Sequence, residues 1–263
     1  MAVLALVSVA GCAGHLASKT DVFTMDRERL TITGHPLHFM LVKPASPRPA
    51  PFLVMFASGD AGMMGVSKAI LRHLGDEGYY VVAYSSRESL ARFRGPGGTA
   101  DYAEVVAAHL EMNAQAKRAL GLPDRTPMIM TGMSRGASMV IVTAGDSTLR
   151  PGIAGAVAIA LTRELDYLHV PRRAGRPHGI KLDENQKVQT YPAIERLGTV
   201  PLAIIQSTND KYVPSAESRR LLGPDTPTRR LYEVEATNHS FHGGQDALMR
   251  DLDDALRWIT APR

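Results

Sequence analysis

The 263-residue chain is long enough for one large domain or two small ones, and its 44% hydrophobic and 21% charged residues allow a substantial buried core. The 30 Lys and Arg exceed the 26 Asp and Glu only slightly and are scattered outside residues 163–181, which gives nucleic-acid binding no particular support. The single cysteine excludes an internal disulfide and a cysteine-rich metal site.

The start of the chain indicates an exported protein. Residues 1–10 are apolar and uncharged, a run too short to span a bilayer as a helix but typical of the core of a secretory signal. Residues 9–12 (VAGC) resemble the lipobox of bacterial lipoproteins, which implies removal of residues 1–11 and diacylation of Cys12. A polar linker follows, to residue 21. The alternative is a buried strand with a core cysteine. The favoured prediction is a periplasmic or envelope protein tethered by lipid.

Strands and helices alternate through the expected domain, residues 22–263. Two short antiparallel strands open it, at residues 22–25 and 38–42. The expected later strands are apolar runs at residues 52–57, 79–84, 128–130, 153–161, 202–207 and 231–234. The expected helices have apolar stripes at Val66, Ile70 and Leu74, at Tyr102, Val106 and Leu110 behind a Thr99 cap, over residues 137–144, and at Leu248, Leu252, Ala255 and Ile259. This order predicts a mostly parallel sheet covered on both faces, and residues 162–200 are long enough to form a small cap.

Residues 132–136 read GMSRG, between an apolar strand and an apolar helix. This is the G-x-S-x-G pattern in the strand–turn–helix context of a nucleophile elbow. The turn strains the backbone of Ser134, and a side chain in place of either glycine would collide with a neighbouring element. The elbow would hold Ser134 Oγ above the sheet edge and aim the N–H of Arg135 at an oxyanion. The pattern alone also fits an ordinary strand-to-helix turn.

A serine hydroxyl becomes a good nucleophile only when a base takes its proton, and an acid must orient that base. Asp210 follows the strand at residues 202–207, and His239 follows the strand at 231–234. Loops at the carboxyl ends of parallel strands share one edge of a sheet, so we expect Ser134, Asp210 and His239 to meet there.

Other residues compete for these roles. His242 is an alternative base, but His239 lies closer to the end of its strand. Glu164 and Asp166 are alternative acids, although both also fit a solvated start of the cap. His239 and His242 have His-x-x-His spacing, but no third ligand is evident, so we predict no metal there.

A second oxyanion donor is expected on the loop after the strand at residues 52–57, which reads SGDAG. Gly59 permits close approach of the backbone. The N–H of Asp60 is the first choice of donor and that of Gly59 the second, while the Asp60 side chain is expected to stabilise the turn. The glycine-rich stretch at residues 95–98 lacks the phosphate-loop pattern and is interpreted as a flexible connection.

These residues resemble the α/β-hydrolase fold over almost the whole mature chain. More narrowly, the SGDAG loop, the GMSRG elbow and the sequence NHSF at residues 238–241 resemble the VirJ/AcvB-type bacterial virulence hydrolases. That resemblance implies a periplasmic enzyme that hydrolyses aminoacylated phosphatidylglycerol. It also implies Ser134 as nucleophile, His239 as base and Asp210 as acid.

The sequence thus predicts a serine hydrolase that cleaves a carboxylic ester through an acyl-enzyme, with no metal or organic cofactor. Basic residues of the cap fit either an anionic substrate or a solvated face: Arg163, Arg172, Arg173, Arg176 and Lys181. A general carboxylesterase or peptidase with the same triad remains open, as does a non-catalytic envelope lipoprotein that uses the scaffold for binding. The oligomeric state is left open.

Overall fold

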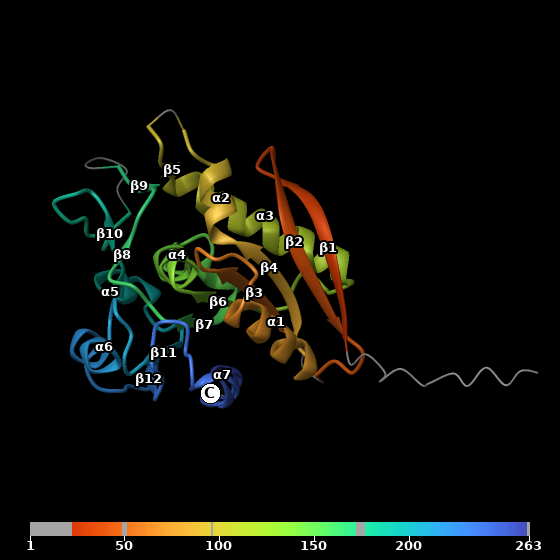
Figure 1. The fold of residues 1–263 in the computed structure, drawn as a ribbon. Helices are drawn as coiled ribbons and strands as arrows, with labels where there is room; N and C mark the ends of the chain where they lie inside the picture. The colour runs from red at the N-terminus through yellow and green to blue at the C-terminus, as the bar shows by residue number, and fades with distance from the viewer. Residues whose placement is uncertain (1–22, 49–51, 96, 172–176, 262–263) are drawn as a thin grey trace, which may run out of the picture.

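The computed structural model describes residues 23–48, 52–95, 97–171 and 177–261 (Figure 1). The predicted signal and linker, with the lipidation site Cys12, lie outside the described residues. So do three of the predicted cap arginines, Arg172, Arg173 and Arg176. Among the described residues, no helix is both long enough and apolar enough to cross a membrane.

An eight-stranded sheet runs through the molecule in the order β1-β2-β4-β3-β6-β7-β11-β12. Its strands are β1 (Phe23–Ile32), β2 (His35–Pro44), β3 (Leu53–Ser58), β4 (Tyr80–Ser85), β6 (Met128–Met133), β7 (Ile153–Ile159), β11 (Leu202–Ser207) and β12 (Arg229–Val234). β2 pairs antiparallel with β1 and β4, and from β4 to β12 all neighbours are parallel. The predicted mostly parallel sheet is confirmed.

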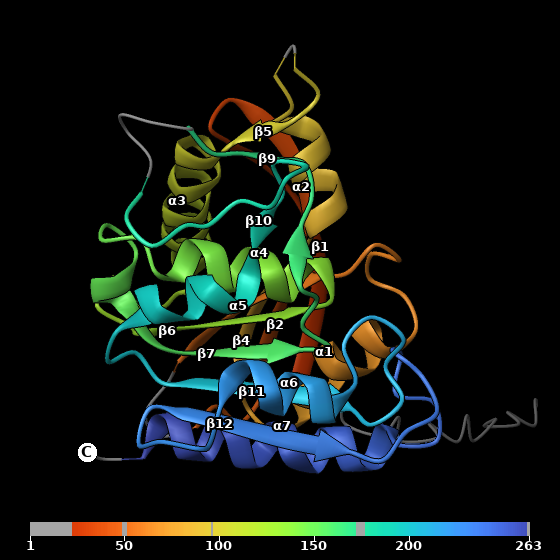
Figure 2. The same cartoon turned by 90° about the vertical axis from the view of Figure 1, so that its left-hand side faces the viewer.

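Helices cover both faces of this sheet (Figures 1 and 2). The α-helices of the described residues are α1 (Val66–Asp76), α2 (Ser86–Arg92), α3 (Tyr102–Leu120), α4 (Arg135–Ala144), α5 (Thr190–Ala193), α6 (Ser215–Leu222) and α7 (Gln245–Thr260), of which α5 packs on α4 instead of the sheet. The apolar sides of α1 and α7 share one buried cluster, and those of α2, α3 and α4 share the other. Side chains of β3 alternate between the two clusters, which is why that strand is apolar throughout.

Three details differ from the sequence prediction. β1 extends to Ile32, beyond the predicted end at residue 25. It contains charged residues, which an edge strand tolerates because one side of its ladder faces solvent. Helix α2 was not predicted, although the Ser85 hydroxyl accepts the Glu88 N–H at 3.2 Å, a cap visible as Ser-x-x-Glu. The cap of α3 is Asp101 and not Thr99, because its carboxylate accepts two first-turn N–H groups.

The expected inner stripe of α3 is also partly wrong. Tyr102 and Val106 are buried, but Leu110 is 39% exposed. The buried face continues through His109 and Met112 instead. The pattern of apolar residues alone predicts the wrong inner face for α3, because the polar residue His109 lies on the buried face.

The described parts of the predicted cap, residues 162–171 and 177–200, contain only short elements: β8 (Glu164–Leu165), β9 (Leu168–His169), β10 (Val188–Gln189), α5 and the 3-10 helix η2 (Ile194–Leu197). β8 pairs with β10, and β9 pairs with β5 (Ala100–Asp101), outside the main sheet. Elements β8, α5 and η2 pack against α4, the helix that begins at the elbow (Figure 2). Its role as a cap stays a prediction.

A buried polar pair links the sheet to α3. The Tyr84 hydroxyl of β4 lies 2.5 Å from His109 Nε2, and both side chains are almost fully buried. Burial lowers the pKa of His109 to about 4, because the charged imidazolium is costly in an apolar surrounding. The folded protein therefore holds His109 neutral over a pH range in which the unfolded chain protonates it.

We expect His109 to make folding sensitive to acid. Between the ordinary pKa of 6.5 and about 4, the unfolded state binds more protons at this residue, so the free energy of unfolding falls as the pH is lowered. The loss is on the order of 3 kcal/mol over the whole window. Urea unfolding at a series of pH values should give a flatter profile for His109→Gln than for the parent. The exposed His242→Gln variant should keep the parent's slope, and equal slopes in all three proteins would contradict this account.

Candidate active site

The turn after β6 holds Ser134 in a strained backbone conformation. Its φ is 55° and its ψ is −123°, a region that residues other than glycine rarely adopt. The Ser134 N–H donates to the Ile159 carbonyl at 2.9 Å, at the end of the neighbouring strand β7. Its own carbonyl accepts the Ser138 N–H at 3.1 Å, the first turn of α4. Strand, strained serine and helix therefore follow one another without an intervening loop.

The two glycines beside Ser134 let three backbone segments approach closely. A Cβ atom on Gly132 would lie 2.4 Å from the carbonyl carbon of Gly136. A Cβ atom on Gly136 would lie 2.1 Å from the Ala57 carbonyl oxygen of β3. Both distances are far below van der Waals contact and both partners are backbone atoms, so neither position accommodates a side chain.

The structure brings Ser134, His239 and Asp210 into one hydrogen-bonded chain. His239 Nε2 lies 2.8 Å from Ser134 Oγ, and His239 Nδ1 lies 2.6 Å from Asp210 Oδ2. An ionised carboxylate only accepts hydrogen bonds, so Nδ1 carries the ring proton and donates a hydrogen bond to Asp210. The lone pair of Nε2 then accepts the Ser134 hydroxyl, which is the arrangement a general base requires.

Asp210 is held in place by donors from its own loop and strand. Its Oδ1 accepts the N–H groups of Tyr212 at 2.8 Å and Val213 at 3.4 Å. Its Oδ2 accepts Gln206 Nε2 at 2.9 Å as well as His239. The Asp210 side chain is fully buried, so these donors replace water around the carboxylate and fix its direction.

Sequence reasoning missed Gln206 and Tyr212. Gln206 is a fully buried amide in β11 whose Oε1 accepts the Leu161 N–H at 3.0 Å, so one side chain ties the end of β7 to the Asp210 loop. The signal was a polar residue inside an otherwise apolar buried strand. The Tyr212 ring packs edge-on against the His239 ring, with centroids 4.8 Å apart. An exposed aromatic in a loop gave no sequence signal for that contact.

The competing residues lie elsewhere. His242 is exposed, and its Nδ1 lies 3.5 Å from the Thr237 hydroxyl. Glu164 and Asp166 each lie 3.2 Å from Lys187 Nζ, with no contact to His239. His239 is thus the histidine that meets Ser134, and Asp210 is the carboxylate that meets His239.

The loop between β3 and α1 lies against Ser134. A Cβ atom on Gly59 would lie 3.0 Å from Ser134 Cβ, so the backbone of this loop borders the serine. Among the described residues, no acceptor takes the N–H of Asp60 or that of Arg135. Arg135 is the first residue of α4, where an N–H has no partner within the helix. Both expected oxyanion donors are therefore free to bind a ligand.

The side chains of these two residues make a contact that the sequence did not suggest. The Asp60 carboxylate lies 3.0 Å from the Arg135 guanidinium, so it bridges to the elbow instead of stabilising only its own turn. Arg135 also lies over the ring of Tyr167, 5.0 Å from its centroid, and Arg94 lies 4.4 Å from the same centroid. The ion pair links the loop after β3 to the first residue of α4, the two places that carry the expected donors.

A pocket with a volume of about 350 Å³ opens beside the serine. Its lining residues are Asp60, Ser134, Arg135, Thr162, Arg163, Glu164, Asp166, Lys187 and Tyr212. Arg163 is paired with Glu217 at 2.6 Å, and Lys187 lies between Glu164 and Asp166. Lys187 donates hydrogen bonds to these two carboxylates, and these bonds raise its pKa, the bond to Asp166 most and the bond to Glu164 next. The pocket therefore has charged groups of both signs.

No protein-family model and no curated protein sequence matches this chain. Several solved structures match it. A putative dienelactone hydrolase from Klebsiella pneumoniae superposes with a TM-score of 0.62 at 17% identity, covering 91% of this chain and 99% of that chain. Est1E from Butyrivibrio proteoclasticus gives 0.61 at 15% identity, covering 89% and 99%. The esterase Pf2001 from Pyrococcus furiosus gives 0.61 at 15% identity, covering 89% and 90%.

The chain has the α/β-hydrolase fold. In α/β-hydrolases the nucleophile, acid and base follow in that order along the chain, as Ser134, Asp210 and His239 do after β6, β11 and β12. At these identities the likeness concerns the fold. The narrower resemblance to the VirJ/AcvB-type hydrolases stays a prediction, as do the catalytic roles of the three residues.

Replacing Gly136 should damage the elbow far more than an ordinary surface change. In Gly136→Ala the new methyl group would overlap the backbone of β3, and we expect a loss of about 3 kcal/mol or more in the free energy of unfolding. Gly152→Ala is a matched control, since a Cβ atom there meets nothing within 4 Å. That variant should stay within about 0.5 kcal/mol of the parent in urea unfolding. Similar stabilities for the two variants would contradict the close packing described above.

Proposed function

We propose that this protein is a serine hydrolase that cleaves a carboxylic ester through an acyl-enzyme. The observation that carries the proposal is the hydrogen-bonded chain from Ser134 Oγ through His239 to the buried Asp210 carboxylate. A base in contact with the serine and an acid in contact with the base are what nucleophilic catalysis by serine needs. The names of the structural neighbours, which include esterases and a putative dienelactone hydrolase, point to the same class of reaction.

The geometry suggests how each group would act. His239 Nε2 takes the proton of Ser134 as the alkoxide attacks the ester carbonyl, and the Asp210 carboxylate stabilises the imidazolium that forms. The N–H groups of Arg135 and Asp60, or Gly59, hold the negative oxygen of the tetrahedral intermediate. His239 then gives the proton to the departing alcohol. Water repeats the sequence on the acyl-enzyme and releases the acid.

For the substrate we propose a polar ester that has charged groups, with an aminoacylated phospholipid of the bacterial envelope as the specific candidate. Such a lipid has an ammonium group on its aminoacyl part and a phosphate beyond it. The mixed charges that line the pocket beside Ser134 support this class. One neighbour, Est1E, has been solved with ferulic acid bound, which shows that an aromatic acid occupies a related fold.

We also propose that the protein is exported and held at the envelope by a lipid on Cys12. Support comes from the apolar run at residues 1–10 and the lipobox-like residues 9–12. A lipid anchor would bring the active site to the surface where its substrate lies.

The proposal predicts a reactive serine. A fluorophosphonate should label the folded protein at Ser134, and Ser134→Ala should abolish labelling and lower kcat by at least about 10³-fold. The rates are measured on a panel of short acyl esters together with vesicles that contain aminoacylated phospholipid. Ser240→Ala is the matched control, because this exposed serine lies next to His239 but outside the hydrogen-bonded chain.

Two outcomes would count against the proposal. Folded protein that takes up no label would favour a binding protein built on the hydrolase scaffold. Hydrolysis of short esters or peptides without activity on the lipid would agree with the proposed triad but contradict the proposed substrate. It would favour a general carboxylesterase or peptidase.

The anchor can be tested separately from the chemistry. In cells, Cys12→Ser should move the protein from the membrane fraction to a soluble fraction, because the acylated residue is gone. The soluble variant should keep the parent's kcat on water-soluble esters. A variant that stays in membranes, or that is folded and inactive, would show that the two roles are not divided in this way.

A further inference from the structure

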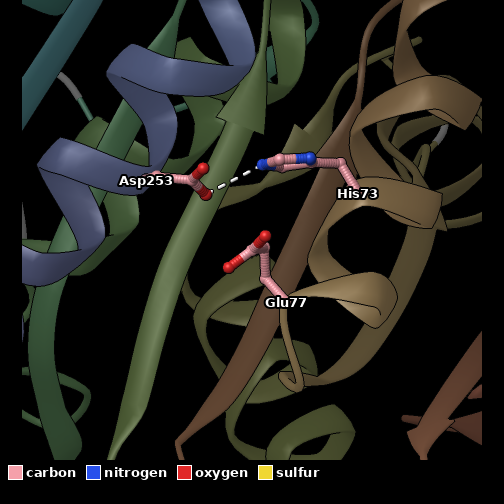
Figure 3. Close-up of side chains that lie close together, drawn as sticks. All are labelled: His73, Glu77 and Asp253. Atoms are coloured by element: carbon pink, nitrogen blue, oxygen red, sulfur yellow. Dashed lines mark hydrogen bonds and ion pairs between the residues drawn. The ribbon is translucent and has the colours of Figure 1, made fainter. Parts of the chain in front are cut away.

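A second cluster of reactive side chains lies between α1 and α7, on the sheet face opposite α4. His73 lies in the last turn of α1, Glu77 caps that helix, and Asp253 projects from the middle of α7. Figure 3 shows the Asp253 carboxylate and the His73 ring facing each other, with the Glu77 carboxylate turned toward the gap between them. One ligand atom from each residue lies within 4.8 Å of the other two.

From this geometry we propose that His73, Glu77 and Asp253 bind a divalent transition-metal ion of the Zn²⁺ class. Imidazole nitrogen and carboxylate oxygen are both ligands of such ions, at roughly 2.0–2.2 Å. Two ligands side by side around an ion at that distance are roughly 3.0–3.5 Å apart. His73 Nε2 and Asp253 Oδ1 are already 2.8 Å apart, so a small outward shift admits the ion.

The third ligand is the most adaptable one. Glu77 is exposed, while His73 and Asp253 are only partly exposed. The histidine and aspartate are therefore held by the packing of two helices, and the glutamate can swing onto the ion from the solvent side. Water can fill the remaining positions, as in sites with three protein ligands.

The end of α1 adds a second reason for a cation. Carbonyl groups at a helix C-terminus carry a partial negative charge, which favours positive ions there. The neighbouring guanidinium groups are engaged in other contacts. Arg48 donates to the Glu77 backbone carbonyl at 3.1 Å and lies over the Tyr79 ring, and Arg257 is paired with Asp254. Among the described residues, no arginine lies within ion-pair distance of the Glu77 or Asp253 carboxylate, so both can face a cation.

The ion would cross-link the two helices. Helix α1 follows the loop that carries Asp60, and α7 follows the loop that carries His239. The cluster lies at the far end of α1, about 16 Å of helix away from the Asp60 loop. We therefore expect the ion to stabilise the fold and to leave the chemistry at Ser134 unchanged. The inference does not depend on the proposed function.

The test uses the full chain after treatment with a chelator. Titration calorimetry with ZnCl₂ should give one site with a dissociation constant in the micromolar range. A free Zn²⁺ concentration about 100-fold above that constant should raise the Tm by about 5–10 °C. Glu77→Gln should weaken binding by at least about tenfold, and His73→Gln or Asp253→Asn should abolish both the heat of this site and the Tm shift.

His38→Gln is the matched control. His38 also contacts a carboxylate, that of Glu88 at 2.8 Å, but the part of the chain that the structure describes offers no third ligand near that pair, so this variant should bind Zn²⁺ as the parent does. If His73→Gln is too unstable to study, Glu77→Gln still decides the question because its side chain is exposed. The absence of binding in the parent would overturn the proposal. So would binding that is equally strong in the parent and in Glu77→Gln.

Discussion

The strained turn at Ser134 is the constraint on which the rest of the site depends. A positive φ at a serine persists only where the surrounding backbone leaves no alternative. Here β6, α4 and β3 meet so closely that Gly132 and Gly136 have no room for a Cβ atom. The serine N–H is bound to β7, which fixes the turn from a third direction. The fold therefore sets the direction of the hydroxyl before any substrate arrives.

The parallel sheet brings the other two residues of the site to Ser134. Because β6, β11 and β12 run in the same direction, the loops after them emerge at one edge, and residues about 100 positions apart in the chain can touch. Asp210 anchors the far end of that contact, since it is buried and surrounded by donors. His239 lies between a fixed carboxylate and a fixed hydroxyl, and the Tyr212 ring packs nearly perpendicular to the His239 ring. Preorganisation of this kind is what makes a serine reactive.

Much of this arrangement follows from the sequence, for physical reasons. Buried parallel strands are apolar throughout, so their positions along the chain could be predicted, and with them the loops of Ser134, Asp210 and His239. The elbow was visible because its two glycines meet a steric requirement. The metal-ligand cluster of His73, Glu77 and Asp253 was not visible, because two of its residues lie on one helix and the third lies 176 positions further on.

Other features depend on tertiary contacts that have no local pattern. The ion pair between Asp60 and Arg135 joins the loop after β3 to the start of α4, and the distance between these two segments cannot be inferred from the sequence. The role of Gln206 could not be predicted, because the function of an amide in a buried strand depends on its hydrogen-bond partners, which only the structure shows. The register of α3 was misread for a similar reason, since His109 is buried against Tyr84 and not exposed.

The most direct measurement of the central claim is a crystal structure of the protein after reaction with a phosphonate ester. We expect phosphorus bonded to Ser134 Oγ, with the phosphoryl oxygen about 2.7–3.1 Å from the N–H nitrogens of Arg135 and Asp60 or Gly59. His239 should remain between the adduct and Asp210. A phosphoryl oxygen that points into solvent, or an adduct on a different residue, would contradict the proposal that this fold builds a serine nucleophile at the elbow.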